Sequence, residues 1–270
     1  MKGPLAEYSI SIFTAAGELL ACDSAKGFAS LVYGAEYQKG DRIVITTSEP
    51  DSHAWVQLDE VLGASLVYLT GSVVYTVPFD EKRYNLSPKA FTGHSHYLFV
   101  REAMPHQIGA YRNLAVNVCD QHDAYNIYPH ASANVETRGE AVFFACNAID
   151  GILENRNHGV WPYQSWGINR QADAELTIDF GREVDVDQVI LFIRADFPHD
   201  NWWTRATLRF SDGTQLQWPL EKDRFGQTLR FPTKRIRWIK IGELIQADDP
   251  SPFPALTQLE VYGTELPEGE

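Results

Sequence analysis

Residues 206–218 have the sequence Ala206-Thr-Leu-Arg-Phe-Ser-Asp-Gly-Thr-Gln-Leu-Gln-Trp218. Apolar and polar side chains alternate up to Phe210 and again from Gln215, and the pair Asp212-Gly213 stands between the two runs. Alternation with a period of two is typical of β-strands, and an Asp-Gly pair between two such runs is a strong signal for a tight turn. The stretch therefore predicts an antiparallel β-hairpin.

The same pattern recurs on both sides of this hairpin. No amphipathic helical periodicity extends over a dozen residues, and only single helical turns are expected, near 87–91 and 103–110. Short strands separated by turn residues are typical of β-sandwiches and jelly rolls, so the fold class predicted for the whole chain is all-β and antiparallel. The further predicted strands are 8–13, 42–46, 54–58, 65–69, 72–77, 96–100, 175–179, 188–194, 237–241 and 258–262.

The chain has 270 residues, which suggests two domains. A polar stretch without periodicity, from Gln121 to Asn134, marks the expected boundary. We expect a β-sandwich of unassigned role over 1–127 and a second β-domain over 128–270. Both parts contain a strand ending in an acid followed by a more apolar strand, so a second jelly roll is one interpretation of the first part. The other interpretation is that any two β-domains show such a pair of strands.

Lys and Arg number 23 and Asp and Glu 36, which gives a net charge of −13. Such a charge repels nucleic-acid phosphates and anionic lipid, so neither nucleic acid nor a membrane surface is an expected partner. The charge favours a neutral ligand. It does not indicate an oligomeric state.

Three cysteines, Cys22, Cys119 and Cys146, show no metal-ligand spacing and are odd in number. They do not form a disulfide framework, which favours a reducing compartment. The N-terminus lacks the apolar core of a secretory signal, and no segment has the run of apolar residues that a membrane span needs. We expect a cytoplasmic protein, or a secreted one if a signal has been removed.

From residue 128 onward, five motifs follow one another in an order that suggests a family. They are Pro129-His-Ala-Ser-Ala133, Asn147-Ala-Ile-Asp-Gly151, Glu175-Leu-Thr-Ile-Asp-Phe-Gly181, the strand Val189 to Arg194, and Ala255-Leu-Thr-Gln-Leu-Glu-Val-Tyr-Gly263. This ordered set resembles the discoidin-like domain, also known as the coagulation factor 5/8 type C domain. It is most similar to the sugar-binding branch of that family, which includes the family 32 carbohydrate-binding modules.

The resemblance implies a galactose-binding-like jelly roll that binds a carbohydrate without changing it, through loops at one end. It also implies a structural calcium ion near the Asn-Ala-x-Asp-Gly loop, because calcium takes six to eight oxygen ligands from such a loop. A turn in which Asp150 bonds its own backbone is the alternative. Family members usually add a Glu where this chain has Gln258, which lowers the expected affinity. The implied metal ligands are Asn147, Asp150, Ile152, Asn155 and Gln258.

A neutral sugar presents an apolar face and a set of hydroxyls, so its site needs an aromatic ring and a few fixed polar groups. The segment Arg194 to Trp203 supplies both kinds directly after a predicted buried strand. The resemblance implies that Arg194 bonds sugar hydroxyls and that polar residues following it assist. The full set of expected sugar-binding residues is His158, Trp161, Trp166, Arg194, His199, Asp200, Trp202, Trp203 and Phe253.

Each of these residues also has a structural interpretation. At least two of the four tryptophans are expected in the core or at the sandwich edge, since large rings are usually buried. Arg194 is also compatible with an ion pair to Asp179 or Asp196 that only holds the scaffold.

An enzymatic alternative rests on His94, His96 and Glu102 in the first part. A His-x-His pair followed by a carboxylate resembles the first metal motif of cupins, which are also jelly rolls, and such ligands suit iron, manganese or zinc. The spacing to Glu102 is longer than in cupins. No nucleophile elbow or phosphate-binding glycine loop is present. A protein–protein adaptor is the third class, and an exposed apolar patch on the first part would favour it.

Overall fold

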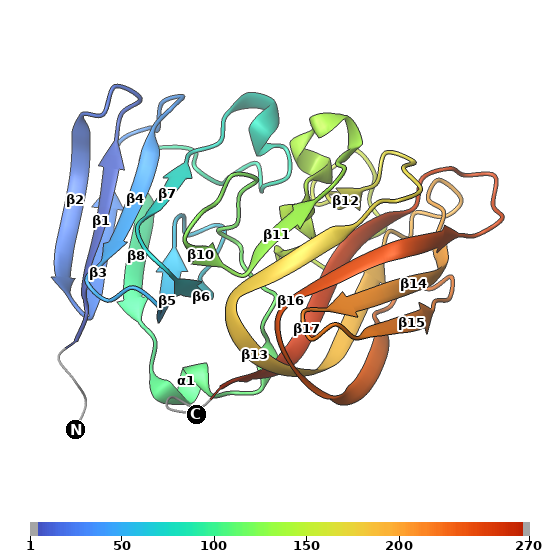
Figure 1. Cartoon of the computed structure of the whole chain (residues 1–270). Coiled ribbons are helices and arrows are strands. Elements are labelled where there is room, and N and C mark those ends of the chain that lie inside the picture. Colours follow the sequence, from blue (N-terminus) through green and yellow to red (C-terminus); the bar gives the residue numbers. More distant parts are fainter. Residues whose placement is uncertain (1–4, 267–270) are drawn as a thin grey trace.

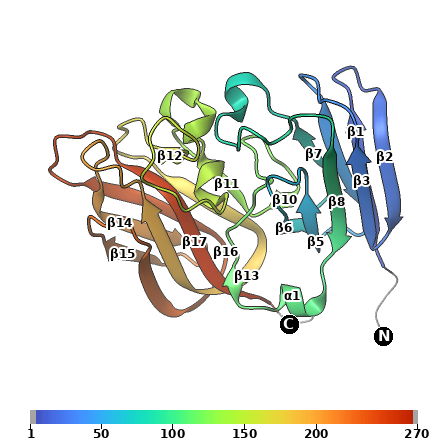
Figure 2. The same ribbon diagram turned by 180° about the vertical axis from the view of Figure 1, so that it is seen from behind.

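The computed structural model of the protein describes residues 5–266. Two β-sandwiches lie side by side (Figure 1), and the view from behind shows the same division (Figure 2). The predicted all-β, antiparallel fold class is confirmed. In the described part of the chain, no helix is long and apolar enough to cross a membrane.

The first sandwich consists of two antiparallel sheets. One has the order β2-β1-β4-β7, and the other has the order β10-β6-β5-β8-β3. The strands of the first sheet are β1 (Glu7–Phe13), β2 (Leu19–Lys26), β4 (Arg42–Thr47) and β7 (Val73–Thr76). Those of the second are β3 (Phe28–Tyr33), β5 (Ser52–Gln57), β6 (Ser65–Leu69), β8 (His96–Glu102) and β10 (Ile127–Tyr128).

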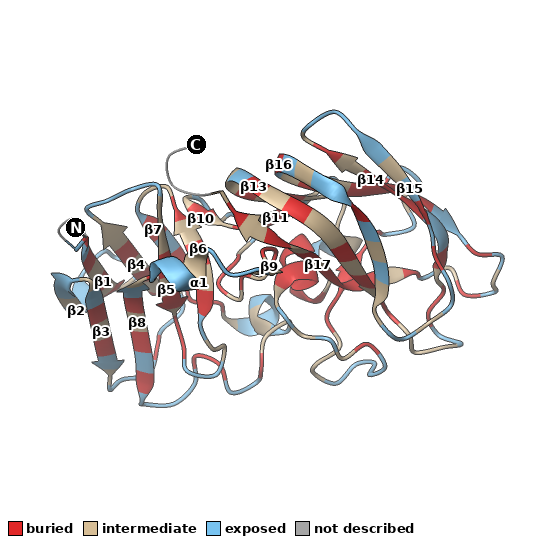
Figure 3. Ribbon diagram, turned by 90° about the horizontal axis from the view of Figure 1, so that it is seen from below, coloured by how far each residue is buried: buried red, intermediate tan, exposed pale blue. Residues whose placement is uncertain are grey.

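Alternation along these strands builds the first core. Tyr8, Ile10 and Ile12 of β1 are fully buried, whereas the residues between them are only partly buried. Inward side chains from both sheets belong to one apolar cluster, so the two sheets face each other across it. The alternation of buried and exposed residues is visible along β3 and β8 in Figure 3.

Within residues 5–266, helical structure is confined to short turns. The turn expected near 103–110 is α1 (Pro105–Ile108). Residues 87–91 form a non-helical turn, and the helical turn of that region lies earlier, at η1 (Asp80–Arg83). Three more 3-10 turns lie between residues 133 and 166: η2 (Thr137–Gly139), η3 (Ala141–Phe143) and η4 (Ala145–Ile149).

The second sandwich is built from one strongly curved sheet with the order β12-β17-β13-β16-β14-β15, while β11 pairs with β13 and β9 with β17. The predicted hairpin at 206–218 is confirmed as β14 and β15. The two predicted strands 175–179 and 188–194 are parts of a single strand, β13. The bounds are β9 (Arg112–Asn113), β11 (His130–Ala133), β12 (Trp166–Gly167), β13 (Leu176–Ile193), β14 (Trp203–Phe210), β15 (Gln215–Pro219), β16 (Gln227–Gln246) and β17 (Ala255–Glu265).

Strand β13 changes direction near Gly181, and the parts before and after this bend pair with different strands. Its first part, Leu176–Asp179, pairs with β11 and with the end of β16, and its second part, from Val184 on, pairs with β17 and the start of β16. Gly181 has φ +70°, and a Cβ there would lie 2.5 Å from the Tyr128 ring. Only glycine fits this bend without displacing the neighbouring ring.

Two separate apolar cores follow from this arrangement. The chain passes between them more than once: Leu114 and Ala115 belong to the second core, Cys119 and Ile127 return to the first, and Ala131 is again in the second. The domain boundary at 127/128 therefore stays a prediction, because residues 112–131 contribute to both sandwiches. All three cysteines are free, and Cys119 and Cys146 are buried.

Candidate functional site

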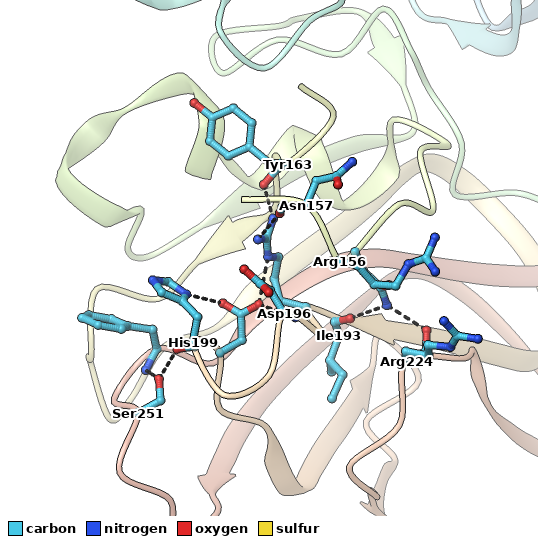
Figure 4. Close-up of polar contacts among 12 residues, drawn as sticks. Arg156, Asn157, Tyr163, Ile193, Asp196, His199, Arg224 and Ser251 are labelled. Carbon is cyan, nitrogen blue, oxygen red and sulfur yellow. Dashed lines mark hydrogen bonds and ion pairs between the residues drawn. The ribbon is translucent and has the colours of Figure 1, made fainter. Parts of the chain in front are cut away.

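A pocket of about 500 Å³ lies in the loops that adjoin β12, the end of β13 and the start of β17. Polar contacts on its wall, with Tyr163, Asn157 and His199 among the labelled side chains, are drawn in Figure 4. Four stretches of chain contribute to its lining. The lining residues are Thr137, Arg138, Phe143, His158, Tyr163, Ser165, Gly167, Ile168, Asn169, Arg170, Arg194, His199, Asp200, Pro252, Phe253, Pro254 and Ala255.

Three exposed rings form a row along one wall of this pocket. The centroids of His158 and His199 lie 4.0 Å apart, and those of His199 and Phe253 lie 5.9 Å apart with an interplanar angle of 17°. The guanidinium carbon of Arg170 lies 4.7 Å from the centroid of the Phe253 ring. Because these side chains are exposed, a ligand can reach ring faces and hydrogen-bond donors at the same wall.

Arg194 is the buried centre of the site. It stands at the end of β13, and its guanidinium donates to the backbone carbonyls of Tyr163 and Asn157 and, from Nε at 3.3 Å, to Asp200 Oδ2. The residue is only 3% exposed. Arg194 therefore connects the loop that carries His158 to the loop that follows β13.

Asp200 completes this network from the other side. Its Oδ2 also accepts the backbone N–H of Asp196 at 2.8 Å, and its Oδ1 lies 3.1 Å from His199 Nδ1. The carboxylate is buried and paired with Arg194, so the charge is compensated. The Ser251 hydroxyl donates to the His199 carbonyl, which attaches this loop to the one that carries Phe253. The pair Arg194–Asp200 thus holds the row of rings in place.

Of the nine residues expected to bind sugar, the structure brings five together at the pocket: His158, Arg194, His199, Asp200 and Phe253. The four tryptophans lie elsewhere. Trp166 and Trp203 are fully buried in the second core, and Trp166 Nε1 donates to the Val135 carbonyl at 2.9 Å. Trp161 lines a different hollow with Tyr84 and Pro88, and Trp202 lies under the Lys222 ammonium, 4.6 Å from its ring. Burial keeps Trp166 and Trp203 from any ligand.

Sequence reasoning missed five other lining residues of the pocket, namely Thr137, Arg138, Phe143, Asn169 and Arg170. Three of these residues have positive φ: Arg138 at 54°, Asn169 at 49° and Arg170 at 59°. Such backbone conformations are uncommon outside glycine and concentrate in functional loops. The visible signal was the turn composition of Thr137-Arg-Gly-Glu140 and of Asn169-Arg170, which lack strand periodicity.

The loop expected to hold calcium is closed by hydrogen bonds within the protein. Asp150 Oδ1 accepts the Ile152 N–H at 2.8 Å, Asp150 Oδ2 accepts Gln164 Nε2 at 2.8 Å, and Gln258 Oε1 accepts the Gly151 N–H at 3.2 Å. The amide of Asn155 donates to the carbonyls of Ile193 and Arg224. Amide donors therefore point at oxygens that calcium would need.

The charge of the implied calcium ligands also disfavours the ion. Asp150 is the only carboxylate of the implied ligand set, which otherwise holds Asn147, Ile152, Asn155 and Gln258. Burial raises the pKa of Asp150 to about 7, although its hydrogen bond to Gln164 acts against this rise. A single carboxyl that resists ionisation does not fit a hard divalent cation. The residues present fit the turn interpretation better than they fit calcium.

The cupin-like motif is not assembled. His96 is buried, with Nε2 3.1 Å from the Gly93 carbonyl, whereas His94 is exposed and lies 3.3 Å from Glu36. His94 precedes β8, so the two imidazoles do not share a strand face. In the described residues, the groups of three side chains close enough to share an ion are Asp59–Glu60–His96 and His158–Asp196–His199, and neither is the predicted set.

Comparison with known proteins gives fold neighbours only. No protein-family model matches the chain, and no curated protein matches it significantly. The similar solved structures include the family 32 carbohydrate-binding module of NanJ from C. perfringens in complex with galactose, with 21% identity over 49% of this chain and 91% of that chain and a TM-score of 0.39. They also include chitosan-binding module 1 of a chitosanase/glucanase from Paenibacillus sp. IK-5, with 18% identity over 56% and 98% of the two chains and a TM-score of 0.38.

A third similar structure is the Streptococcus pneumoniae fucose-binding module SpX-3, with 13% identity over 57% of this chain and 98% of that chain and a TM-score of 0.42. These neighbours are carbohydrate-binding modules. At these identities and TM-scores they do not indicate which ligand this chain binds.

Proposed function

We propose that the protein binds a neutral carbohydrate, without changing it chemically, in the pocket beside Arg194. The observation that supports this most is the row of exposed rings, His158, His199 and Phe253, standing beside a fixed set of donors. A sugar ring can lie on such a row while its hydroxyls bond neighbouring polar groups. In the same wall, Arg170 and Asn169 are exposed and offer donors to hydroxyls.

The pairing of charges at the site favours ligand binding over catalysis. The buried charges, Arg194 and Asp200, are paired with each other. Single shallow sites of this kind bind in the micromolar to millimolar range, about −4 to −8 kcal/mol.

The test is a glycan array on the whole protein, followed by calorimetric titration with the best sugar. Removing the Phe253 ring by Phe253→Ala should weaken binding by about 1–2 kcal/mol, since half-exposed ring area is lost from the contact. The chain supplies a matched control in Phe225, which is 62% exposed and also lies under a guanidinium, that of Arg224 at 4.6 Å.

Phe225→Ala removes an equivalent ring away from the pocket and should leave sugar binding unchanged. Equal losses in both variants, or an array that responds only to acidic glycans, would contradict the proposal of a neutral ligand at this pocket.

A second candidate function, contact with another protein, is favoured by an apolar strip on the first sandwich. Phe28, Val32 and Tyr97 are 42%, 75% and 40% exposed on the adjacent strands β3 and β8, where Val32 pairs with Tyr97. Exposed apolar groups gathered on neighbouring strands are typical of interfaces. Sedimentation that depends on concentration in the wild type and not in Val32→Lys would support this function, with a second copy of the chain as the protein contacted.

A further inference from the structure

We propose that His158, Asp196 and His199 form a binding site for a divalent transition-metal ion of the zinc class at the rim of the pocket. One nitrogen of each imidazole and one oxygen of the carboxylate all lie within 4.8 Å of one another. The three side chains come from two loops, since His158 precedes β12 whereas Asp196 and His199 follow β13. A shared ion would link these loops directly.

The ligand set matches the chemistry of zinc rather than that of calcium. Two imidazoles and one carboxylate are a common set for a zinc ion that keeps its fourth position open to water or a ligand. Calcium prefers oxygen ligands alone. In a tetrahedral zinc site, ligand atoms lie about 3.4 Å apart, so a small adjustment of the exposed His158 side chain closes the site.

A second carboxylate already orients one of the ligands. His199 Nδ1 lies 3.1 Å from Asp200 Oδ1, which leaves His199 Nε2 as the nitrogen available to an ion. Histidine ligands in metal sites commonly engage a carboxylate through their other nitrogen in this way. Asp200 is itself fixed by Arg194 Nε and by the backbone N–H of Asp196. The orientation of His199 is therefore built into the fold before any ion arrives.

The other two ligands are available. In the described part of the chain, neither the Asp196 carboxylate nor the His158 imidazole has a hydrogen-bonding or ion-pair partner, and the rings of His158 and His199 meet at a tilt of 43°. The two imidazole rings lie 4.0 Å apart between centroids, and the Asp196 carboxylate lies beside them. Together they offer a metal ion two nitrogen ligands and one negatively charged oxygen ligand.

The second group of this kind, Asp59–Glu60–His96, shows what a purely structural cluster looks like. Both oxygens of Asp59 accept backbone N–H groups, from Val61 at 2.9 Å and Phe91 at 2.8 Å, and Glu60 accepts the N–H of Tyr97 at 3.0 Å. Asp59 and His96 are 1% exposed. An ion cannot enter there without breaking these bonds, whereas the site at the pocket rim is open.

An ion at this site would also face the pocket, because two of its three ligands, His158 and His199, line the pocket. Its open position would then be shared with a water or with hydroxyls of the bound sugar, which rests on the proposed function. The metal site itself does not rest on it, since the three ligands need no sugar.

The test is calorimetric titration of tag-free, chelator-treated full-length protein with zinc chloride, beside melting curves with and without zinc. We expect one zinc per chain, a higher melting temperature with zinc, and at least a tenfold loss of affinity in both His158→Ala and Asp196→Asn. His94→Ala is the matched control, since His94 is an exposed histidine beside a single carboxylate. It should bind zinc as the wild type does.

Zinc binding that is unchanged in His158→Ala and Asp196→Asn, or absent from the wild type, would overturn the site. Sugar titration of the metal-free Asp196→Asn variant separates the two proposals, because Asp196 is not a lining residue of the pocket. Sugar binding with no zinc binding in the wild type would leave the proposed function standing and remove the metal site. Zinc binding with no sugar binding would leave the metal site standing and remove the proposed function.

Discussion

Arg194 illustrates how the role of a single residue depends on its partners. The sequence resemblance implies a direct contact with sugar, and the alternative was an ion pair with Asp179 or Asp196. The structure pairs it with Asp200 instead and directs two more of its donors to backbone carbonyls. Arg194 still reaches the pocket wall, but most of its hydrogen bonds maintain the loops.

We therefore expect Arg194→Ala to lower the free energy of unfolding by about 3–5 kcal/mol, because it leaves the Asp200 carboxylate buried without its partner. Phe253→Ala should change stability by less than about 1 kcal/mol, because that ring is half exposed. Chemical denaturation of both variants measures the difference. An Arg194→Ala variant as stable as the wild type would show that the pair does not hold the site.

The amide of Gln258, in place of a carboxylate, disfavours calcium at the neighbouring loop. We expect identical melting curves for the wild type in chelator and in millimolar calcium, because Asp150 alone cannot hold the ion. Gln258→Glu adds a second carboxylate beside the Gly151 N–H that Gln258 now accepts. This variant should melt lower in chelator, from the added buried charge, and recover with calcium by mass action. A calcium-dependent shift in the wild type would contradict this expectation.

At the scale of the element, the start of β14 gives two adjacent tryptophans different environments. Trp203 is fully buried in the second core, whereas Trp202, one residue earlier, is partly exposed and covered by Lys222. Successive side chains point to opposite faces where a strand begins, so one ring enters the core and the other does not.

Trp203→Ala should cost about 3–5 kcal/mol of stability and Trp202→Ala clearly less, since only the first change empties a core position. Both variants should bind sugar as tightly as the wild type while they remain folded, because neither ring lines the pocket. Thermal unfolding together with sugar titration measures both effects. A folded Trp202→Ala variant with reduced sugar affinity would show that the Trp202 ring contacts the sugar.

At the scale of the whole molecule, the two sandwiches share a charged cluster around Glu265 of β17. Arg112 Nη2 lies 2.7 Å from Glu265 Oε1, Arg182 donates to both carboxylate oxygens, and His53 of the first sandwich lies 3.2 Å away. Burial by itself would raise the pKa of Glu265, but His53 and Arg182 outweigh it and hold that pKa below the usual range. Burial also lowers the pKa of His53, and its contact with Glu265 acts against this fall.

A carboxyl whose pKa is lower in the folded than in the unfolded state stabilises the protein above its unfolded pKa of about 4.5 and loses that contribution as the pH falls. Glu265→Gln should therefore lower the free energy of unfolding by about 3 kcal/mol at pH 7. The gap between variant and wild type should narrow below about pH 4.5. Urea denaturation at pH 7 and pH 4 tests this, and a gap that widens on acidification would contradict it.

The sequence by itself determined the fold class, because alternation such as that of Tyr8–Phe13 and the Asp212-Gly213 turn are local signals. It also indicated five of the pocket residues, from His158 to Phe253, because they lie in or near loops that the sequence resemblance assigns to ligand binding. Strands β2 and β3 were missed because several of their apolar side chains, among them Leu19, Leu20 and Val32, face solvent and blur the alternation.

Only the tertiary structure decided which of these residues meet. That Arg194 donates to the carbonyls of Asn157 and Tyr163, and that Arg170 covers Phe253, depends on how distant loops converge at one end of the sandwich. The crossing of residues 112–131 between the two cores has the same origin. Such contacts join residues far apart in the chain, and local pattern carries no information about them, because each depends on packing that forms only when both sheets are in place.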